Sequence, residues 1–132
     1  MDATDKIILS ILKENSRESA SEIAKQVSLS VPPVTERIRK LEQGGIIEKY
    51  TLRINPCVLG YNLLVFVLVK IDASRNLEAF QDEATALANV LECHHIAGPS
   101  DYLLKVLAKD MQDLETFLSC TIKDLPGVTQ TQ

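Results

Sequence analysis

The chain has 132 residues, a formal net charge of -4 and a composition of 45% hydrophobic and 24% charged residues. This length allows one domain or two small ones, and no apolar run approaches the roughly 18 residues of a membrane-spanning helix. The start of the chain is acidic where a secretory signal would be basic, and the three cysteines are widely spaced. We therefore expect a cytoplasmic protein with reduced thiols.

Apolar residues at helical spacing predict three helices before residue 46. Asp2 can cap the first helix, with Asp5 near its positive N-terminal end. The apolar side of this helix comprises Ile8, Leu9 and Leu12. The second helix begins with a capping-box pattern, in which Ser19 and Glu22 can each accept a hydrogen bond from an otherwise unsatisfied backbone N–H.

A third helix is predicted after a tight turn, with Ser30 as its N-cap. Pro32 and Pro33 are tolerated there because the N–H groups of a first helical turn have no intrahelical acceptor. Gly44 and Gly45 provide the stop. The predicted buried side comprises Val34, Ile38 and Leu41. The predicted outer side comprises Pro33, Thr35, Glu36, Arg37, Arg39 and Lys40.

Two short helices around a tight turn, with cations on the outer side of the second, are typical of a DNA-binding helix-turn-helix. Spacing alone does not separate this interpretation from an ordinary helical hairpin with a solvated charged face. Residues 1–50 carry eight Lys or Arg and eight Asp or Glu, whereas residues 51–132 carry six and ten. Because the first half is neutral, DNA binding would require a local cationic patch, duplication by dimerisation and a strong dependence on salt.

The chain changes character after residue 46. Residues 49–54 alternate between polar and apolar, which predicts a half-buried strand, and the stretch from Asn55 to Gly60 reads as a hinge. The predicted elements that follow are a strand at 64–71, a helix at 77–87, strands at 90–96 and 102–108, a helix from Met111 and a last strand from Val128. This β-α-β-β-α-β order is the ferredoxin-like arrangement.

A set of residues in matching order and spacing runs through the whole chain. In the first half they are Asp2, Asp5, Ile8-Leu9, Asn15-Ser16-Arg17, Glu22-Ile23-Ala24, Ser30, Val34, Arg37-Ile38, Leu41 and Gly45-Ile46-Ile47. In the second half they are Tyr50, Leu59-Gly60, Gly98, Asp101-Tyr102 and Pro126-Gly127-Val128. With these residues the chain resembles the Lrp/AsnC family of prokaryotic transcriptional regulators, also called feast/famine regulators.

The resemblance implies a DNA-binding regulator of α+β architecture that is not an enzyme and needs no cofactor. It implies a winged helix-turn-helix at 1–48, a strand and hinge linker at 49–61, and a ferredoxin-like effector-binding and oligomerisation domain at 62–132. It also implies homodimers formed through the sheets, often assembled further. A small effector, commonly an amino acid, would bind near a Gly-x-x-Asp turn. On this chain the turn comprises Gly98, Pro99, Ser100 and Asp101.

In such a regulator the third helix would enter the major groove of double-stranded DNA. The residues expected near base edges are Ser30, Pro33, Thr35 and Arg37, of which Arg37 is the foremost candidate for a base or phosphate contact. Those expected to contact the phosphate backbone are Arg39, Lys40 and Lys49. Glu36 could accept a hydrogen bond from a cytosine amino group, but we favour an ion pair with Lys40 one turn later.

Other interpretations remain open for the second half. Asp101 could bind the ammonium of an amino acid, bond the amides of its own turn, or do both. Cys93 and His95 lie on one face of a predicted strand, but two ligands do not make a metal site, and we prefer histidines at an interface. An enzyme using Cys93, His95 and Asp101 lacks any recognisable catalytic motif.

A DNA-organising protein without effector sensing could be encoded by the same sequence. The sequence also departs from the family pattern at its end. The last strand of the family normally continues with further apolar residues, whereas this sequence reaches Gln132 soon after Val128. We therefore expect either a truncated or a short final strand, and this affects the expected higher-order assembly.

Overall fold

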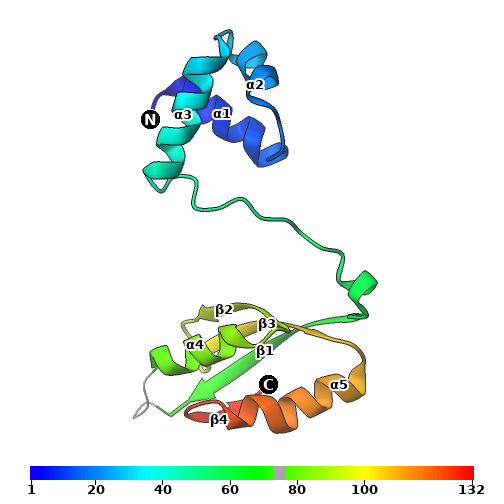
Figure 1. Ribbon diagram of the computed structural model, residues 1–132. Coiled ribbons are helices and arrows are strands. Elements are labelled where there is room, and N and C mark those ends of the chain that lie inside the picture. The colour runs from blue at the N-terminus through cyan, green and yellow to red at the C-terminus, as the bar shows by residue number, and fades with distance from the viewer. Residues whose placement is uncertain (73–76) are drawn as a thin grey trace. The chain divides into compact units, whose positions relative to one another are not determined.

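The structure is a computed structural model that describes residues 1–72 and 77–132. The chain divides into two compact units, an N-terminal unit of Met1–Arg53 and a C-terminal unit of Ile54–Gln132 (Figure 1). Each unit has a hydrophobic core of its own. In the described part of the chain, no helix is long and apolar enough to cross a membrane.

The N-terminal unit is built from three helices, as predicted. They are α1 (Ala3–Glu14), α2 (Ala20–Val27) and α3 (Val31–Gln43). Their shared core comprises Ile8, Leu12, Ile23, Ala24, Val34 and Leu41. Leu9 and Ile38, which we also expected on the buried sides, are partly buried and pack against this core. Apolar spacing therefore placed the helices and their inner faces correctly.

Side-chain caps fix the N-terminal ends of α1 and α2. The N–H of Asp5 donates to Oδ1 of Asp2 at 2.9 Å, and the N–H of Asp2 donates to Oδ2 of Asp5 at 3.1 Å, which completes a capping box. At α2, Oγ of Ser19 accepts a hydrogen bond from the N–H of Glu22 at 3.1 Å. The carboxylate of Glu22 does not complete the predicted box, because it pairs with Nζ of Lys25 at 2.7 Å.

Two prolines occupy the first turn of α3. Pro32 and Pro33 lie where the missing N–H groups would have had no helical acceptor. Ser30 is at the N-cap position with an extended backbone, but its hydroxyl makes no capping hydrogen bond. Ser28 closes the preceding turn in the left-handed region, with φ of 56°. The hydroxyl of Ser30 is thus left available at the exposed start of α3.

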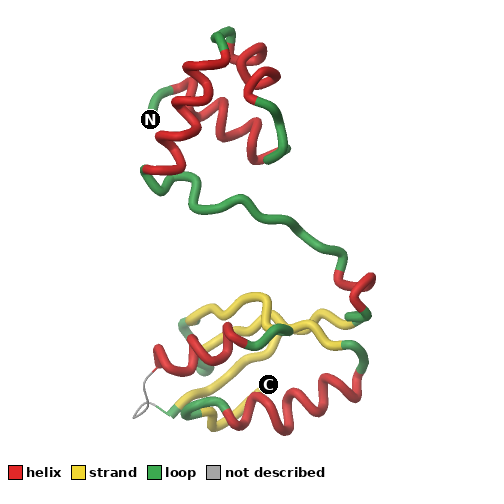
Figure 2. Tube along the Cα trace, in the orientation of Figure 1, coloured by secondary structure: helices red, strands yellow, loops and turns green. Residues whose placement is uncertain are grey.

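The segment 48–55 carries no helix, strand or turn, and Figure 2 draws it as a loop. The strand predicted over 49–54 does not form within the single chain. A strand needs a partner for its backbone N–H and C=O groups, and none of the described strands pairs with this segment. Its alternate apolar side chains are consequently exposed, Leu52 by 75% and Tyr50 and Ile54 by about half.

The C-terminal unit is a four-stranded antiparallel sheet with helices on one face (Figure 1). The strands are β1 (Leu63–Ile71), β2 (Val90–His95), β3 (Tyr102–Ala108) and β4 (Val128–Thr131). They lie in the order β2-β3-β1-β4, with α4 (Leu77–Ala86) between β1 and β2 and α5 (Met111–Thr116) after β3 in sequence. This confirms the predicted α+β class and ferredoxin-like order.

The inner face of the sheet packs against the helices. Its core comprises Val67, Val69, Ile71, Phe80, Ala84, Val90, Tyr102, Leu104, Val106, Phe117, Ile122 and Leu125. The rings of Phe80 and Tyr102 lie 4.9 Å apart between their centroids. The helix predicted from Met111 is α-helical only to Thr116, and continues as a π turn (Phe117–Thr121) and a 3-10 turn (Ile122–Asp124).

The last strand, β4, is an edge strand of four residues that pairs with β1. The pairing extends to Gln132, whose N–H donates to the carbonyl of Leu68 at 2.9 Å, while the N–H of Leu68 donates to the carbonyl of Gln132 at 2.7 Å. The register shifts between Lys70 and Ile71. The last residues of the sequence thus lie beside the middle of β1.

Candidate DNA-binding and effector sites

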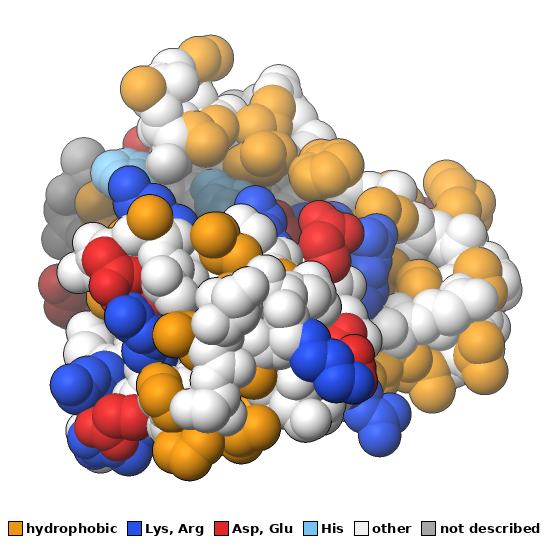
Figure 3. All heavy atoms as spheres, turned by 90° about the horizontal axis from the view of Figure 1, so that it is seen from above, with side chains coloured by type: hydrophobic (Ala, Val, Ile, Leu, Met, Phe, Trp, Pro, Cys, Tyr) orange, Lys and Arg blue, Asp and Glu red, His pale blue; other side chains and the backbone are white. Residues whose placement is uncertain are grey.

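The N-terminal half of α3 is exposed, as a DNA-reading surface requires. Ser30, Pro33 and Thr35 are all exposed, and so is Lys49 in the segment after the helix. Behind this surface the helix is anchored through Val34. On the face drawn in Figure 3, Lys and Arg side chains are interspersed with Asp and Glu side chains and form no continuous basic patch.

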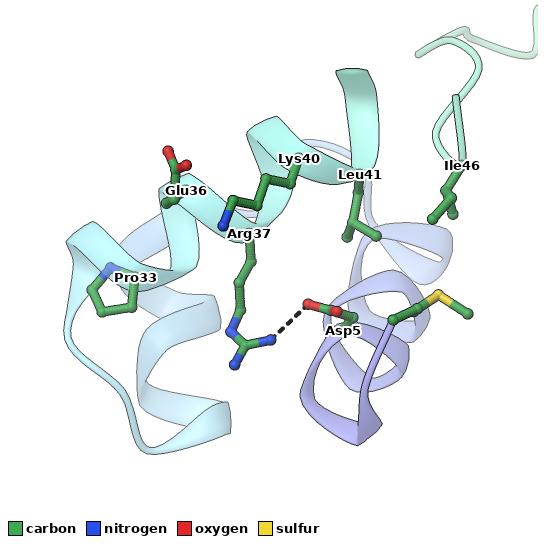
Figure 4. A pocket seen from close by; sticks show the side chains of 8 residues that line it. Asp5, Pro33, Glu36, Arg37, Lys40, Leu41 and Ile46 are labelled. Carbon is green, nitrogen blue, oxygen red and sulfur yellow. Dashed lines mark hydrogen bonds and ion pairs between the residues drawn. The ribbon is translucent and has the colours of Figure 1, made fainter. Parts of the chain in front are cut away.

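Arg37 lies differently from the other cations of α3. Its Nη1 donates to Oδ2 of Asp2 at 2.7 Å and to Oδ1 of Asp5 at 2.9 Å. Figure 4 shows the guanidinium pointing from α3 toward Asp5 on α1. The Arg37 side chain is 31% exposed. The expectation that Arg37 stands on the outer side of α3 is thus wrong in part, because two carboxylates hold it against α1.

The ion pairs of this cluster favour the charged forms of all three groups. The hydrogen bond from Arg37 is the main reason that the pKa of Asp5 is lowered, followed by the backbone N–H of Asp2. The pKa of Asp2 is lowered mainly by the backbone N–H of Asp5 and then by Arg37. In turn, the two carboxylates raise the pKa of Arg37. The cluster therefore stays charged through the neutral range.

Glu36 pairs with Arg39 instead of Lys40, so the predicted Glu36–Lys40 ion pair is wrong. Oε1 and Oε2 of Glu36 accept hydrogen bonds from Nη2 and Nε of Arg39 at 2.6 and 2.8 Å. A guanidinium presents two parallel N–H donors that match the two carboxylate oxygens, whereas an ammonium acts as a point charge, which favours Arg39 as the partner. Among the residues that the structure describes, Lys40 makes no ion pair.

A surface pocket of about 480 Å³ separates the N-terminal end of α1 from α3. Figure 4 shows Lys40 and Glu36 on α3 at this pocket, with Arg37 beneath them. The residues that line it are Met1, Asp5, Pro33, Glu36, Arg37, Lys40, Leu41 and Ile46. Since paired charges form much of the wall, Lys40 is the group there best able to attract an added anion.

The predicted effector turn, 98–101, is joined to the end of β1 by Asp101. Oδ2 of Asp101 accepts a hydrogen bond from the N–H of Ile71 at 2.7 Å. The N–H of Asp101 donates to the carbonyl of Val69 at 2.9 Å. The carbonyl of Asp101 accepts a hydrogen bond from the N–H of Ile96, also at 2.9 Å. One carboxylate oxygen thus has a structural role, which leaves Oδ1 as the candidate to bind an effector. Gly98 has φ of 144°, in the region that favours glycine.

A small pocket of about 90 Å³ lies beside this turn. Its walls comprise Leu68, Lys70, Pro99, Ser100, Gln130 and Gln132. The structure therefore brings two of the predicted effector residues, Pro99 and Ser100, together with polar side chains of β1 and β4. Sequence reasoning missed Lys70 and Gln130, since only the pairing of Lys70 with Gln130 across the β1–β4 ladder places them beside the turn.

The cysteine and histidines of β2 lie in separate local surroundings. Burial raises the pKa of the Cys93 thiol, which disfavours the nucleophilic thiolate. The ring of His95 stacks on Tyr102, with centroids 5.1 Å apart. His94 pairs with Glu92, Nε2 to Oε2 at 2.9 Å. In the described ranges, no three His, Cys, Asp or Glu side chains are placed to hold a metal ion.

Family comparisons cover both units of the chain. Residues 64–132, slightly more than half of the chain, match the model of the Lrp/AsnC ligand binding domain. Residues 1–48 match a model of winged helix-turn-helix DNA-binding domains. The leucine-responsive regulatory proteins of Klebsiella pneumoniae and Escherichia coli (strain K12) are each 39% identical to this chain over 134 residues, which cover 100% of this chain and 82% of theirs.

Solved structures agree with this result. A transcriptional regulator of Neisseria meningitidis, in complex with L-Met, has a TM-score of 0.94 at 32% identity and covers 100% of this chain and 86% of that one. LrpC of B. subtilis has a TM-score of 0.87 at 34% identity, covering 100% of this chain and 91% of that one. The three-helix unit and the ferredoxin-like unit described above are the two parts that these matches share, and the chain belongs to the Lrp/AsnC family of DNA-binding transcriptional regulators.

Proposed function

We propose that this regulator acts as a homodimer or larger homo-oligomer, reads specific double-stranded DNA in the cytoplasm through α3, and changes its assembly when an amino acid binds near the turn 98–101. The observation that carries the proposal is the exposed N-terminal half of α3 on a firmly packed three-helix core. This is the geometry by which a recognition helix enters a major groove.

The proposed DNA surface combines the start of α3 with cations that follow it. Ser30, Pro33 and Thr35 would approach base edges, with Glu36 at their side. Arg39, Lys40 and Lys49 would contact phosphates and set the register on the duplex. Arg39 is paired with Glu36, so Lys40 is the strongest phosphate-binding candidate of α3. Arg37 is instead bound to Asp2 and Asp5 at the start of α1.

The second copy would bind on the outer face of the sheet. Leu64 and Phe66 of β1 are 52% and 60% exposed there, and Leu68 and Leu103 are half-buried beside them. An apolar strip of this kind is the usual mark of an interaction surface. The unpaired segment 49–54 supports the same proposal, because its period-two pattern would be satisfied by pairing with a second copy.

The proposed effector is an amino acid, by analogy with the Neisseria regulator solved with L-Met. The ammonium of Lys70 could bind its carboxylate, and Oδ1 of Asp101 could bind its ammonium. The pocket beside the turn has roughly the volume of three waters in one chain, so we infer that a second copy supplies further walls. An effector bound between copies alters assembly only if it binds one assembly better than the other.

The DNA-binding proposal is tested by selection from a pool of random-sequence duplexes. We expect enrichment of a motif with dyad symmetry, because a dimer presents two related helices. On the enriched duplex, Lys40→Ala should reduce the slope of log affinity against log salt by about 0.9 for each phosphate left without its cation, or about 1.8 per dimer. Lys123→Ala, an equal charge change on the C-terminal unit, is the control. Failure to enrich any motif would contradict sequence-specific reading.

Effector binding is tested by thermal unfolding in the presence of each of the twenty amino acids. A true effector at about 100 times its Kd should stabilise the protein by about 2.7 kcal/mol, a rise of several degrees in Tm. Lys70→Ala should remove most of this rise, whereas Lys123→Ala should keep it. No response to any amino acid would favour a DNA-organising protein without amino-acid sensing.

A further inference from the structure

We propose that Arg37 is a positioning residue, which fixes the DNA-reading helix α3 on α1 by binding both carboxylates of the α1 capping box. This inference rests on the proposed function, in that α3 must be the helix that reads DNA. It replaces the expectation that Arg37 itself contacts a base or a phosphate.

The same nitrogen of Arg37 joins two residues at the start of the chain. Nη1 lies 2.7 Å from Oδ2 of Asp2 and 2.9 Å from Oδ1 of Asp5, across 35 and 32 residues of sequence. These are charge-assisted hydrogen bonds, the stronger class of side-chain contact. The Asp5 side chain is only 15% exposed, so water competes little for its partner.

Both carboxylates are also held by backbone hydrogen bonds, in addition to their contacts with Arg37. Asp2 and Asp5 each accept the backbone N–H of the other, which sets their oxygens at the first turn of α1. Each residue therefore uses one oxygen to cap α1 and the other to bind α3. The hydrogen bonds that cap α1 and those that hold α3 against it belong to a single network, and damage to either end should affect both.

The surroundings of Arg37 disfavour a phosphate contact. To reach a phosphate, the guanidinium would have to leave two carboxylates, and the phosphate would have to approach those same negative charges. Lys40 lies one turn later on the same helix and makes no ion pair within the described residues. Arg37 and Lys40 can therefore be compared on the same helix, since Arg37 is held by two carboxylates and Lys40 is in no ion pair among the described residues.

The decisive measurement is the salt dependence of DNA affinity for Arg37→Ala and Lys40→Ala, on a duplex enriched with the wild-type protein. Lys40→Ala should reduce the slope by about 0.9 per chain. Arg37→Ala should weaken DNA binding at least tenfold at every salt concentration, because α3 is then held less well in its reading position. The slope of log affinity against log salt should stay unchanged, because the substitution removes no side chain that contacts a phosphate. A reduced slope for Arg37→Ala, equal to that of Lys40→Ala, would overturn the proposal.

Asp5→Asn distinguishes the two roles of Arg37 by the sign of its effect. If Asp5 only kept Arg37 away from DNA, the substitution would free the guanidinium, remove a negative charge and tighten DNA binding. If Arg37 positions α3, Asp5→Asn should instead weaken binding, and the double variant Asp5→Asn/Arg37→Ala should be scarcely worse than Arg37→Ala alone. Tighter binding by Asp5→Asn would therefore contradict a positioning role.

Folding is monitored by circular dichroism and thermal unfolding of the full chain. Should Arg37→Ala fail to fold, Arg37→Lys is the substitute, since it keeps the charge but loses the planar guanidinium whose Nη1 bonds both carboxylates, and it should give an intermediate affinity with the wild-type slope. If the wild-type protein itself binds no DNA, the proposed function fails. The positioning role of Arg37 can still be tested by thermal stability, through the Tm values of Asp5→Asn, Arg37→Ala and the double variant. If the losses in Tm of the two single variants add up in the double variant, the positioning role is overturned.

Discussion

Phe66→Lys is expected to convert the protein into a monomer and to weaken binding to its DNA site by more than 100-fold. Phe66 is 60% exposed on the outer face of the sheet, where Lys105 is its cross-strand neighbour. Burying a phenylalanine side chain stabilises an interface by about 1.5–3 kcal/mol. A new ammonium would remove this contribution and add repulsion from Lys105. In a two-fold interface the change occurs twice.

The loss of DNA affinity follows from the charge of the N-terminal unit. Residues 1–50 have equal numbers of basic and acidic groups, so we expect one copy to attract DNA weakly and to need a second copy for tight binding. Light scattering gives the oligomeric state, and fluorescence anisotropy gives the affinity. Met111→Lys is the matched control, because Met111 is 68% exposed on α5 and the charge change is identical. A dimeric Phe66→Lys protein would show that the sheet face is not the interface.

The second large effect is expected from Asp101→Ala, which should destabilise the C-terminal unit by about 1–3 kcal/mol. The substitution leaves the part-buried N–H of Ile71 without its acceptor at 2.7 Å, and an unsatisfied donor costs up to about that much when it is buried. For a domain of this size each kcal/mol lowers Tm by about 4–8 °C. Differential scanning calorimetry measures the change.

Asp101→Asn distinguishes the role of Asp101 in the turn from its proposed role in binding the effector. The amide keeps one oxygen that can accept from Ile71, so most of the stability should remain, while the negative charge proposed for the ammonium of an amino acid is lost. We therefore expect a near-normal Tm without effector and a much smaller rise with it. If Asp101→Asn kept the full rise in Tm with effector, Asp101 would have a role only in the turn. If Asp101→Ala left the Tm unchanged, Asp101 would have no structural role either.

The sequence predicted those helices and strands that depend on patterns of residues close together in the chain. The spacing of Val34 and Leu41 identified the buried side of α3, and the strand predicted at 102–108 has the bounds of β3. The ferredoxin-like order followed from these local patterns, because few topologies accept such a succession of elements. Asp2 was likewise predicted as the cap of α1, whereas the return hydrogen bond from its N–H to Asp5 was not predicted.

Contacts between distant residues were beyond sequence reasoning. Nothing in the sequence links Arg37 to the first turn of α1, because that contact depends on how α3 crosses α1. The choice of Arg39 over Lys40 by Glu36 depended on side-chain geometry at equal charge. The strand predicted at 49–54 failed for another reason, since an alternating pattern does not by itself supply a neighbouring strand, and none of the described strands pairs with this segment.

In the proposed dimer, the length of the segment 48–55 would limit the spacing between the half-sites that one pair of reading helices can bind. Eight residues span at most about 28 Å when fully extended. Two such segments, one from each copy of a dimer, would let a pair of reading helices reach half-sites one helical turn apart, about 34 Å between centres. Half-sites separated by several turns exceed this reach. An operator of that kind would have to be bridged by neighbouring dimers of a larger assembly, or by bending of the DNA itself.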